Sequence, residues 1–222
     1  MCGRFTLMID AEELQSEFGL QEIPADYTPR YNIAPSQPVG VVTDWTERRM
    51  EWMRWGLVPS WAKDPSIGSK MINARSETVQ EKPSFRTAFQ RRRCLIPADG
   101  FYEWKKSGGK APSVPYFIHT VDHRPFAFAG LWEFWRSAEG EDLRSCTILT
   151  TQANSFMAPI HDRMPVILSG DGMGDWLGPG NSAIWMDLLK PFPAEKMAAH
   201  PVSTYVNSPF RDGPDLVLPA GH

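Results

Sequence analysis

The second residue of the chain is a cysteine, in the opening stretch MCGRF. Once Met1 is removed, Cys2 carries two nucleophiles on neighbouring carbons, an α-amine with a pKa of about 7.7–8.0 and a thiol with a pKa of about 8.5. An aldehyde would first form an imine with the amine, and the thiol could then close a five-membered thiazolidine ring. Gly3 lets the terminus bend, and the Arg4 cation favours thiolate. The alternative is an inert terminal cysteine, which position alone would favour.

An amide and a guanidinium lie two residues apart in the stretch MINARSET. On an extended segment the side chains of Asn73 and Arg75 would point to one face, because strand side chains alternate. Such a pair suits the phosphates and sugars of a nucleic-acid backbone. An equally good interpretation is a loop held by an internal pair between Arg75 and Glu77, and the sequence leaves both open.

Two further side chains are candidates for acid–base chemistry. Glu103 stands between two aromatic residues in ADGFYEWKK, where burial would favour a neutral carboxyl, although on an amphipathic strand it would face solvent. His161 lies in the polar loop PIHDRMP, and histidines in such loops are often functional. The alternative for this loop is a structural turn in which Asp162 and Arg163 pair.

Metal chemistry is not expected from this sequence. His119 and His123 are four residues apart, but on a predicted strand and turn rather than on a helix. Cys94 and Cys146 lie in apolar strands and are predicted to be buried, unreactive thiols. We therefore expect neither a metal nor any other cofactor.

Length and composition predict one domain spanning residues 1–222, because 222 residues with 42% hydrophobic content can form one large core. A net charge of −3 argues against a general polyanion binder, so any nucleic-acid surface must be local. No apolar run reaches membrane-spanning length, and the start of the chain lacks the pattern of a secretory signal. Three scattered cysteines are typical of a reducing cytosol, so we expect a cytoplasmic protein without membrane contact.

The elements that must position these residues are short helices and many strands. Helices are predicted after Asp10 with a stop at Gly19, over residues 84–93, and around residues 173–177 and 183–189. Strands are predicted in VGVVT, MEWMRW, CLIPA, FYEWKK, YFIHTV, FAFAGLWEFW, RSCTILTTQA, PVIL and VSTYV, with a turn at residues 98–100 and a hairpin loop at 107–113. Short connections favour antiparallel pairing. The expected fold is α+β, one domain with a curved, mostly antiparallel, barrel-like sheet flanked by short helices.

Seven motifs occur together and in order along the chain: MCGRF, RYNIAP, WGLVPSW, INARSET, CLIPADGFYEW, IHDRMP and HPVSTYVN. Each motif alone is weak, but the set, from Cys2 to about Leu216, resembles the SRAP (SOS-response-associated peptidase) family. The resemblance implies a protein that recognises abasic sites in single-stranded DNA, especially near a junction with duplex. In that family the terminal cysteine cross-links to the ring-opened abasic sugar through a thiazolidine, which shields the lesion.

The resemblance also implies roles for particular residues. The expected catalytic residues are Cys2, Asn73, Glu103 and His161. The expected DNA contacts are phosphate-binding arginines and residues that wedge against bases, namely Arg4, Arg75, Arg163, Trp104 and Pro35. Trp61 could also stack on a base, but Ala62 stands where some relatives carry a second tryptophan, which puts one stacking contact in doubt.

Three further expectations concern activity and partners. The family's peptidase name implies no more than removal of Met1, and the imine intermediate could also cleave DNA as a lyase. A cross-linker of this type needs no partner subunit, so a monomer is expected. Two rival functions remain: an N-terminal-nucleophile cysteine amidohydrolase or glutamine amidotransferase, which also begins Met-Cys-Gly, and a non-catalytic binder of single-stranded DNA.

Overall fold

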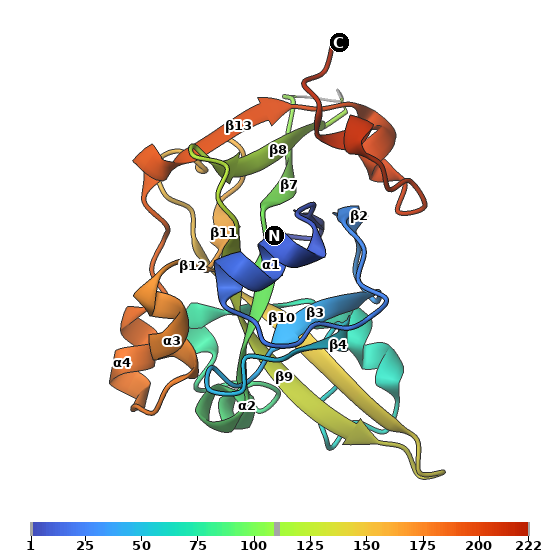
Figure 1. The fold of residues 1–222 in the computed structure, drawn as a ribbon, viewed down its shortest axis with the longest axis vertical. Coiled ribbons are helices and arrows are strands. Elements are labelled where there is room, and N and C mark those ends of the chain that lie inside the picture. Colours follow the sequence, from blue (N-terminus) through green and yellow to red (C-terminus); the bar gives the residue numbers. More distant parts are fainter. Residues whose placement is uncertain (1, 109–111, 222) are drawn as a thin grey trace.

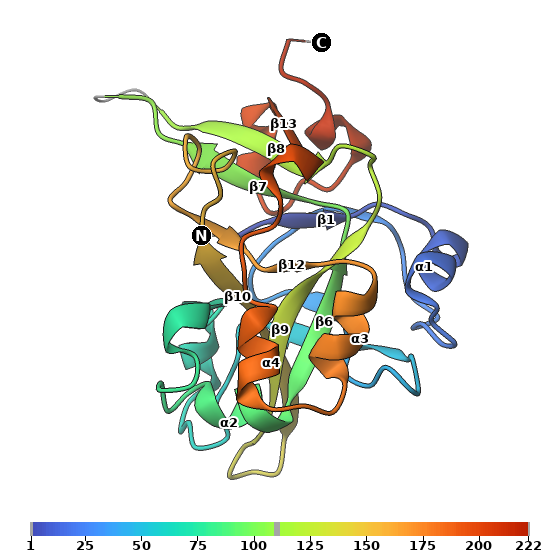
Figure 2. The ribbon, with the colours of Figure 1, turned by 90° about the vertical axis from the view of Figure 1, so that its left-hand side faces the viewer.

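The computed structural model describes residues 2–108 and 112–221 and is built on two sheets (Figures 1 and 2). In one sheet five strands follow in the order β10-β4-β3-β6-β9, and β9 pairs with β10 again, so these strands close into a barrel. They are β3 (Pro38–Val42), β4 (Met50–Trp55), β6 (Arg93–Ala98), β9 (Phe126–Arg136) and β10 (Asp142–Gln152). Strands β4 and β10 run parallel, whereas the other four pairs are antiparallel. The predicted α+β class and barrel-like core are confirmed.

Strand β10 continues beyond the barrel and joins two distant motifs. On one edge its end pairs with β11 (Arg163–Pro165), and on the other edge it pairs with β5 (Asn73–Arg75). Thr150 therefore stands between Arg75 and Pro165. This places MINARSET and PIHDRMP on either side of one strand.

The second sheet carries the start of the chain and has the order β13-β8-β7-β1-β2, all antiparallel. Its strands are β1 (Phe5–Leu7), β2 (Arg30–Ile33), β7 (Gly100–Lys105), β8 (Val114–Thr120) and β13 (Met197–Pro201). Strand β1 packs onto the barrel, because Phe5 makes edge contacts with Trp55 and Phe128 at ring-centroid distances of 5.2 and 5.5 Å. The residues next to Cys2 are thereby fixed in the core.

The predicted turn at residues 98–100 is a crossing between the two sheets, since β6 belongs to the barrel and β7 to the second sheet. Asp99 is buried at this crossing, and its carboxylate accepts hydrogen bonds from Thr6 Oγ1 and from the backbone N–H groups of Met8 and Ile9. A Cβ at Gly100 would lie 2.3 Å from the Phe117 ring, so glycine is required there. These hydrogen bonds to the Asp99 carboxylate hold β1 next to the start of β7.

The helices are short, as predicted. Helix α1 (Ala11–Phe18) begins at the Asp10 cap, whose side chain accepts from Glu13 N at 2.9 Å, and ends at Gly19 with φ of 59°. The others are α2 (Arg86–Arg91), α3 (Asp171–Leu177) and α4 (Ser182–Asp187), with 3₁₀ turns η1 (Pro65–Lys70), η2 (Ser76–Thr78), η3 (Ala194–Lys196), η4 (Thr204–Asn207) and η5 (Pro214–Val217). The short strand β12 (Ile167–Leu168) pairs with β9.

One predicted strand is wrong. The segment VSTYV forms η4 instead, because the Ser203 side chain caps the turn by accepting from Tyr205 N, and only Val202 makes an isolated bridge. The strand of this region is β13, just before it. The predicted hairpin loop at 107–113 lies partly outside the described residues, although β7 and β8 on either side of it pair antiparallel. Within the described part of the chain, no helix is long and apolar enough to cross a membrane.

Candidate functional site

Cys2 is fully buried beside the start of β1, with its thiol 3.8 Å from the Arg4 carbonyl oxygen. The Asn73 side chain donates a hydrogen bond from Nδ2 to the Cys2 carbonyl oxygen at 2.8 Å. The two motifs MCGRF and MINARSET, 71 residues apart, therefore meet at the cysteine. Removal of Met1, predicted above, concerns a residue outside the described part of the chain.

Only one of the two polar atoms of the Asn73 carboxamide is hydrogen-bonded to a described residue. Its Nδ2 is used by Cys2, whereas its Oδ1 is buried and accepts no hydrogen bond from any described residue. The Asn73 Oδ1 atom is therefore able to accept a hydrogen bond from a ligand. The position of Asn73 on β5 is set by the parallel pairing of Asn73 with Ile148 of β10.

Glu103 lies on β7, next to the terminal cysteine. The register of β1 and β7 pairs Phe5 with Phe101, so continuing it by two residues on each side sets Glu103 opposite Gly3. The carboxylate is buried, which rejects the solvent-facing alternative. Burial raises the pKa of the Cys2 thiol well above its ordinary value, and the negative charge of Glu103 raises it further. The thiol is therefore held in its protonated form in this environment.

His161 lies in the loop before β11 and is partly exposed. The backbone N–H of Arg163 points at its Nδ1 at 3.0 Å, and Asp162 Oδ1 lies 2.9 Å from the same nitrogen. The N–H contact makes Nδ1 the acceptor and leaves the proton of a neutral ring on Nε2. These two contacts fix the orientation of the imidazole ring in the loop.

Arg163 does not form the pair with Asp162 that the sequence allowed, and its contact with a phosphate stays a prediction. Its guanidinium is buried and makes a two-pronged pair with Glu77, Nη1 to Oε1 at 3.0 Å and Nη2 to Oε2 at 2.9 Å, and Nη2 also donates to the Thr150 carbonyl at 2.6 Å. It pairs with Glu77 rather than with Asp162, and Glu77 pairs with it rather than with Arg75. A phosphate would have to displace these partners. The geometry thus gives Arg163 a structural role, which ties η2 to β11.

The other two predicted phosphate contacts differ from each other. Arg75 is exposed on β5 and makes no side-chain hydrogen bond with any described residue, so it is available to an anion. Arg4 is half-buried, and its guanidinium donates to Asn32 Oδ1 at 2.8 Å and to the Val206 and Asn207 carbonyls at 2.7 and 3.3 Å. The burial lowers the pKa of Arg4. Its main contacts in this structure are internal.

The predicted base contacts differ in their exposure and partners. Trp104 follows Glu103 on β7, is partly buried, and donates from Nε1 to Asn207 Oδ1 at 2.8 Å. Pro35 is partly exposed in the turn between β2 and β3, next to Ser36, which has a positive φ of 71°. Trp61 is 58% exposed. All three present apolar surface, and their contacts with bases stay predictions.

Comparison with known proteins decides the family. The family model described as SOS response associated peptidase (SRAP) matches residues 1–209. This chain belongs to the SRAP family. It is 46% identical over 222 residues to the abasic site processing protein YoqW of Bacillus subtilis (strain 168), covering 98% of this chain and 99% of that protein. It is 36% identical to the abasic site processing protein HMCES of Gallus gallus, covering 99% of this chain and 78% of that protein.

Solved structures share the SRAP architecture found here. A protein from Bacteroides thetaiotaomicron matches with a TM-score of 0.90 and 29% identity, covering 99% of this chain and 100% of that one. A protein from Bordetella bronchiseptica matches with a TM-score of 0.80 and 30% identity, over 91% of this chain and 100% of that one.

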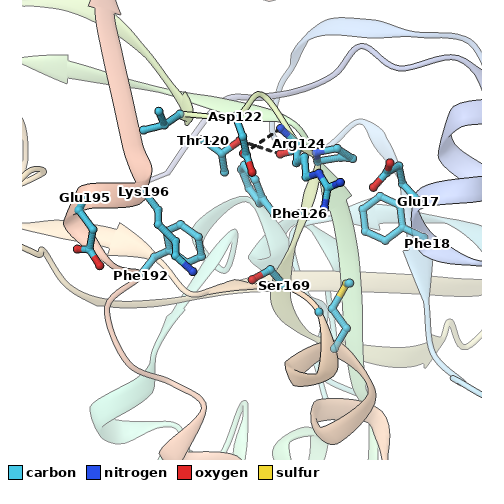
Figure 3. Close-up of a pocket in the computed structure, with 14 residues that line it drawn as sticks. Glu17, Phe18, Thr120, Asp122, Arg124, Phe126, Ser169, Phe192, Glu195 and Lys196 are labelled. Carbon is cyan, nitrogen blue, oxygen red and sulfur yellow. Dashed lines mark hydrogen bonds between the residues drawn. The ribbon is translucent and has the colours of Figure 1, made fainter.

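A cavity of about 530 Å³ in this SRAP chain lies away from the cysteine (Figure 3). It is walled by α1, the β8–β9 connection, the start of α3 and the segment before β13, and its lining contains none of the predicted site residues. Figure 3 shows both acidic and basic side chains around an apolar floor.

Sequence reasoning missed Asn32 and gave Glu77 the wrong partner, although both residues organise this SRAP site. Asn32, in RYNIAP, is fully buried and accepts from Arg4 while donating to carbonyls near the end of the chain. Glu77, in MINARSET, holds Arg163. The position of Asn32 between the apolar side chains of Tyr31 and Ile33 could have indicated that it is buried and hydrogen-bonded. The partner of Glu77 could not be predicted, because Arg163 is 86 residues away in the chain. Among the described residues no group of histidine, cysteine and acidic side chains could hold a metal ion.

Proposed function

We propose that this chain recognises abasic sites in single-stranded DNA and, once Cys2 is the first residue, cross-links to them through a thiazolidine. The names of full-length relatives at 45–46% identity support the substrate class. The observation that carries the chemistry is the contact between Asn73 and Cys2, beside the buried Glu103 carboxylate. An amine and a thiol on one residue, next to a carboxylate that can move protons, suit an aldehyde better than an amide.

The reaction has two steps that balance. The Cys2 amine adds to C1′ of the ring-opened sugar and loses water, which gives an imine. The thiol then adds across the C=N bond: the sulfur–C1′ bond forms, the π bond breaks, and the thiol proton goes to nitrogen. The buried, protonated thiol is a weak first nucleophile, so the amine attacks first.

The neighbouring side chains have complementary roles in these steps. Asn73 holds the backbone of Cys2, and its open Oδ1 accepts from the attacking amine or from a sugar hydroxyl. Glu103 moves protons at the amine and at the departing water. His161, with a proton on Nε2 in its neutral form, donates to the sugar ring oxygen as the ring opens. Arg75 binds a neighbouring phosphate.

A lyase side reaction follows from the same imine. Before the thiol closes the ring, the imine can eliminate the 3′ phosphate and cut the strand. The balance between cutting and cross-linking depends on how fast the thiol captures the imine. We propose that peptide hydrolysis is limited to removal of Met1, and that the protein acts as a monomer in the cytoplasm.

The experiment uses a single-stranded oligonucleotide with one uracil, treated with uracil glycosylase, and a denaturing gel. The wild type should give a heat-stable shifted band, Cys2→Ala should give none, and Cys2→Ser should cut the strand without a stable adduct. Equal shift of intact and abasic strands on a native gel, with no denaturation-resistant band, would reduce the protein to a DNA binder. Glutaminase activity would favour the amidotransferase interpretation.

A further inference from the structure

The loop from Thr204 to Asp212 presents two aromatic side chains to solvent. Phe210 is 95% exposed and Tyr205 is 54% exposed, both unusual for large apolar residues. The Arg211 guanidinium lies over the Tyr205 ring, 4.1 Å from its centroid. The stacked guanidinium and phenol groups form a flat, cationic surface, and Phe210 precedes Arg211 in the chain.

The backbone of this loop is held by hydrogen bonds that involve Asn32 and Asp212. Its side chains are therefore exposed on an ordered backbone. The Asn32 amide donates from Nδ2 to three carbonyls of the loop, those of Val206, Ser208 and Arg211, at 3.3, 3.0 and 2.8 Å. At the far end the Asp212 carboxylate accepts from Tyr31 N at 2.5 Å and pairs with Arg30. The motif RYNIAP thus holds the loop in one shape.

The same loop is joined to the candidate site. Arg4, two residues from Cys2, donates to the Val206 and Asn207 carbonyls, and Trp104, next to Glu103, donates to the Asn207 side chain. Figure 1 shows this segment, in red, beside the upper end of β2 and near the start of the chain. A strand of DNA held at Cys2 would meet this loop within a few nucleotides.

We propose that Tyr205, Phe210 and Arg211 form a stacking platform for unpaired bases on one side of the abasic nucleotide. This proposal rests on the function proposed above and adds a site to it. Aromatic faces bind any base, so the platform would add affinity without sequence preference. Arg211 adds a positive charge, while the nearby Asp212 is neutralised by Arg30. These features favour a nucleic-acid strand over an apolar protein partner.

The test uses strands that carry a tetrahydrofuran in place of the abasic sugar, because this analogue has no aldehyde and reports binding alone. Three strands are compared by fluorescence anisotropy: one with a single nucleotide on each side, one extended by roughly eight nucleotides on the 5′ side, and one extended equally on the 3′ side. Phe210→Ala and Tyr205→Ala are compared with Phe134→Ala, which removes a 37% exposed ring from β9.

Each platform variant should weaken binding of one extended strand about tenfold, while the short strand and the other extended strand bind as with the wild type. The Phe134 variant should match the wild type on all three. Equal binding by all proteins, or equal losses on all strands, would overturn the platform. If the wild-type protein fails to cross-link abasic DNA that carries the aldehyde, the proposed function itself is wrong.

Discussion

The Asn73 amide donates its hydrogen bond to the Cys2 carbonyl at 2.8 Å, while the other half of the same carboxamide is buried without a partner among the described residues. One side chain thus fixes the backbone of Cys2, the proposed nucleophile, and has an acceptor atom left for the proposed substrate. The pairing of β5 with β10 holds it there, so the position of the terminus depends on the barrel.

Replacing Asn73 should slow cross-linking more than it destabilises the fold. Asn73→Ala removes one hydrogen bond of about 1–1.5 kcal/mol at the reacting residue, so we expect a cross-linking rate about tenfold lower. Asn73→Asp should be at least as slow, because a carboxylate repels the Cys2 carbonyl. Rates come from denaturing gels, with thermal melts as the control for folding. A rate equal to that of the wild type would remove Asn73 from the mechanism.

Glu103→Gln should have opposite effects on two reactions of Cys2. Burial and, second to it, the charge of Glu103 raise the pKa of the thiol, so removal of the charge lowers that pKa and speeds alkylation by iodoacetamide at a fixed pH. Cross-linking should become slower, because the proton carrier is lost. Alkylation is followed by mass spectrometry of the N-terminal peptide, with Glu139→Gln, on the exposed β9–β10 turn, as control. Alkylation unchanged or slower would show that the carboxylate does not act on the thiol.

The Glu77–Arg163 pair should matter for stability and for the placement of His161. Glu77→Ala leaves a buried guanidinium without its carboxylate, so we expect a loss of about 2 kcal/mol in the free energy of unfolding, less than for a fully enclosed pair because Glu77 is partly exposed. Glu81→Ala, at an exposed carboxylate, is the matched control. Urea unfolding measures both. A wild-type value for Glu77→Ala would contradict the structural role of the pair.

The same pair gives a pH dependence. Partial burial works against ionisation of Glu77, but the hydrogen bonds and charge of Arg163 outweigh it and hold the pKa of this carboxyl below its ordinary value. A lowered folded pKa gives stability that is full above the unfolded pKa of about 4.3 and is lost as the pH falls through the folded pKa. The stability difference between wild type and Glu77→Ala should therefore shrink below about pH 4.3. A difference that persists undiminished there would argue against the ion pair.

His119 should make the protein less stable in mild acid. Burial lowers the pKa of His119, a hydrogen bond to the Thr120 carbonyl works against this, and the charges of His123 and His200 lower it further. The acidic groups Asp10, Glu13 and Asp99 line the same hollow. A lowered folded pKa means that the unfolded state takes up the proton first, so stability is full above about pH 6.5 and falls below it.

Thermal melts of wild type and His119→Gln at about pH 7.5 and about pH 5.5 test this. The melting temperature of the wild type should fall more between the two pH values than that of the variant. An equal fall in both proteins would show that the proton is taken up elsewhere.

Local signals were enough to predict elements whose ends are set by neighbouring residues, whereas the roles of the site residues come from the family resemblance and stay predictions. The Asp10 cap and the Gly19 stop predicted α1, because capping depends on neighbours in the chain. The prediction of a strand in VSTYV was wrong because a local signal was overlooked. The Ser203 cap outweighed the strand preference of the two valines. Whether β6 and β7 belong to the same sheet depends on how each packs against strands far away in the chain. A single sequence carries no information on those contacts. The partners of Arg163 and Arg4, 86 and 202 residues away, could not be predicted for that reason.

The most direct test of the central claim is the mass of the N-terminal peptide after the protein has reacted with an aldehydic abasic strand. We predict a peptide that starts at Cys2, is joined to the DNA with loss of one water, and has no alkylatable thiol at Cys2, because both the amine and the sulfur are bound to C1′. An adduct that retains Met1, leaves the Cys2 thiol free, or lies on another residue would contradict the proposed mechanism.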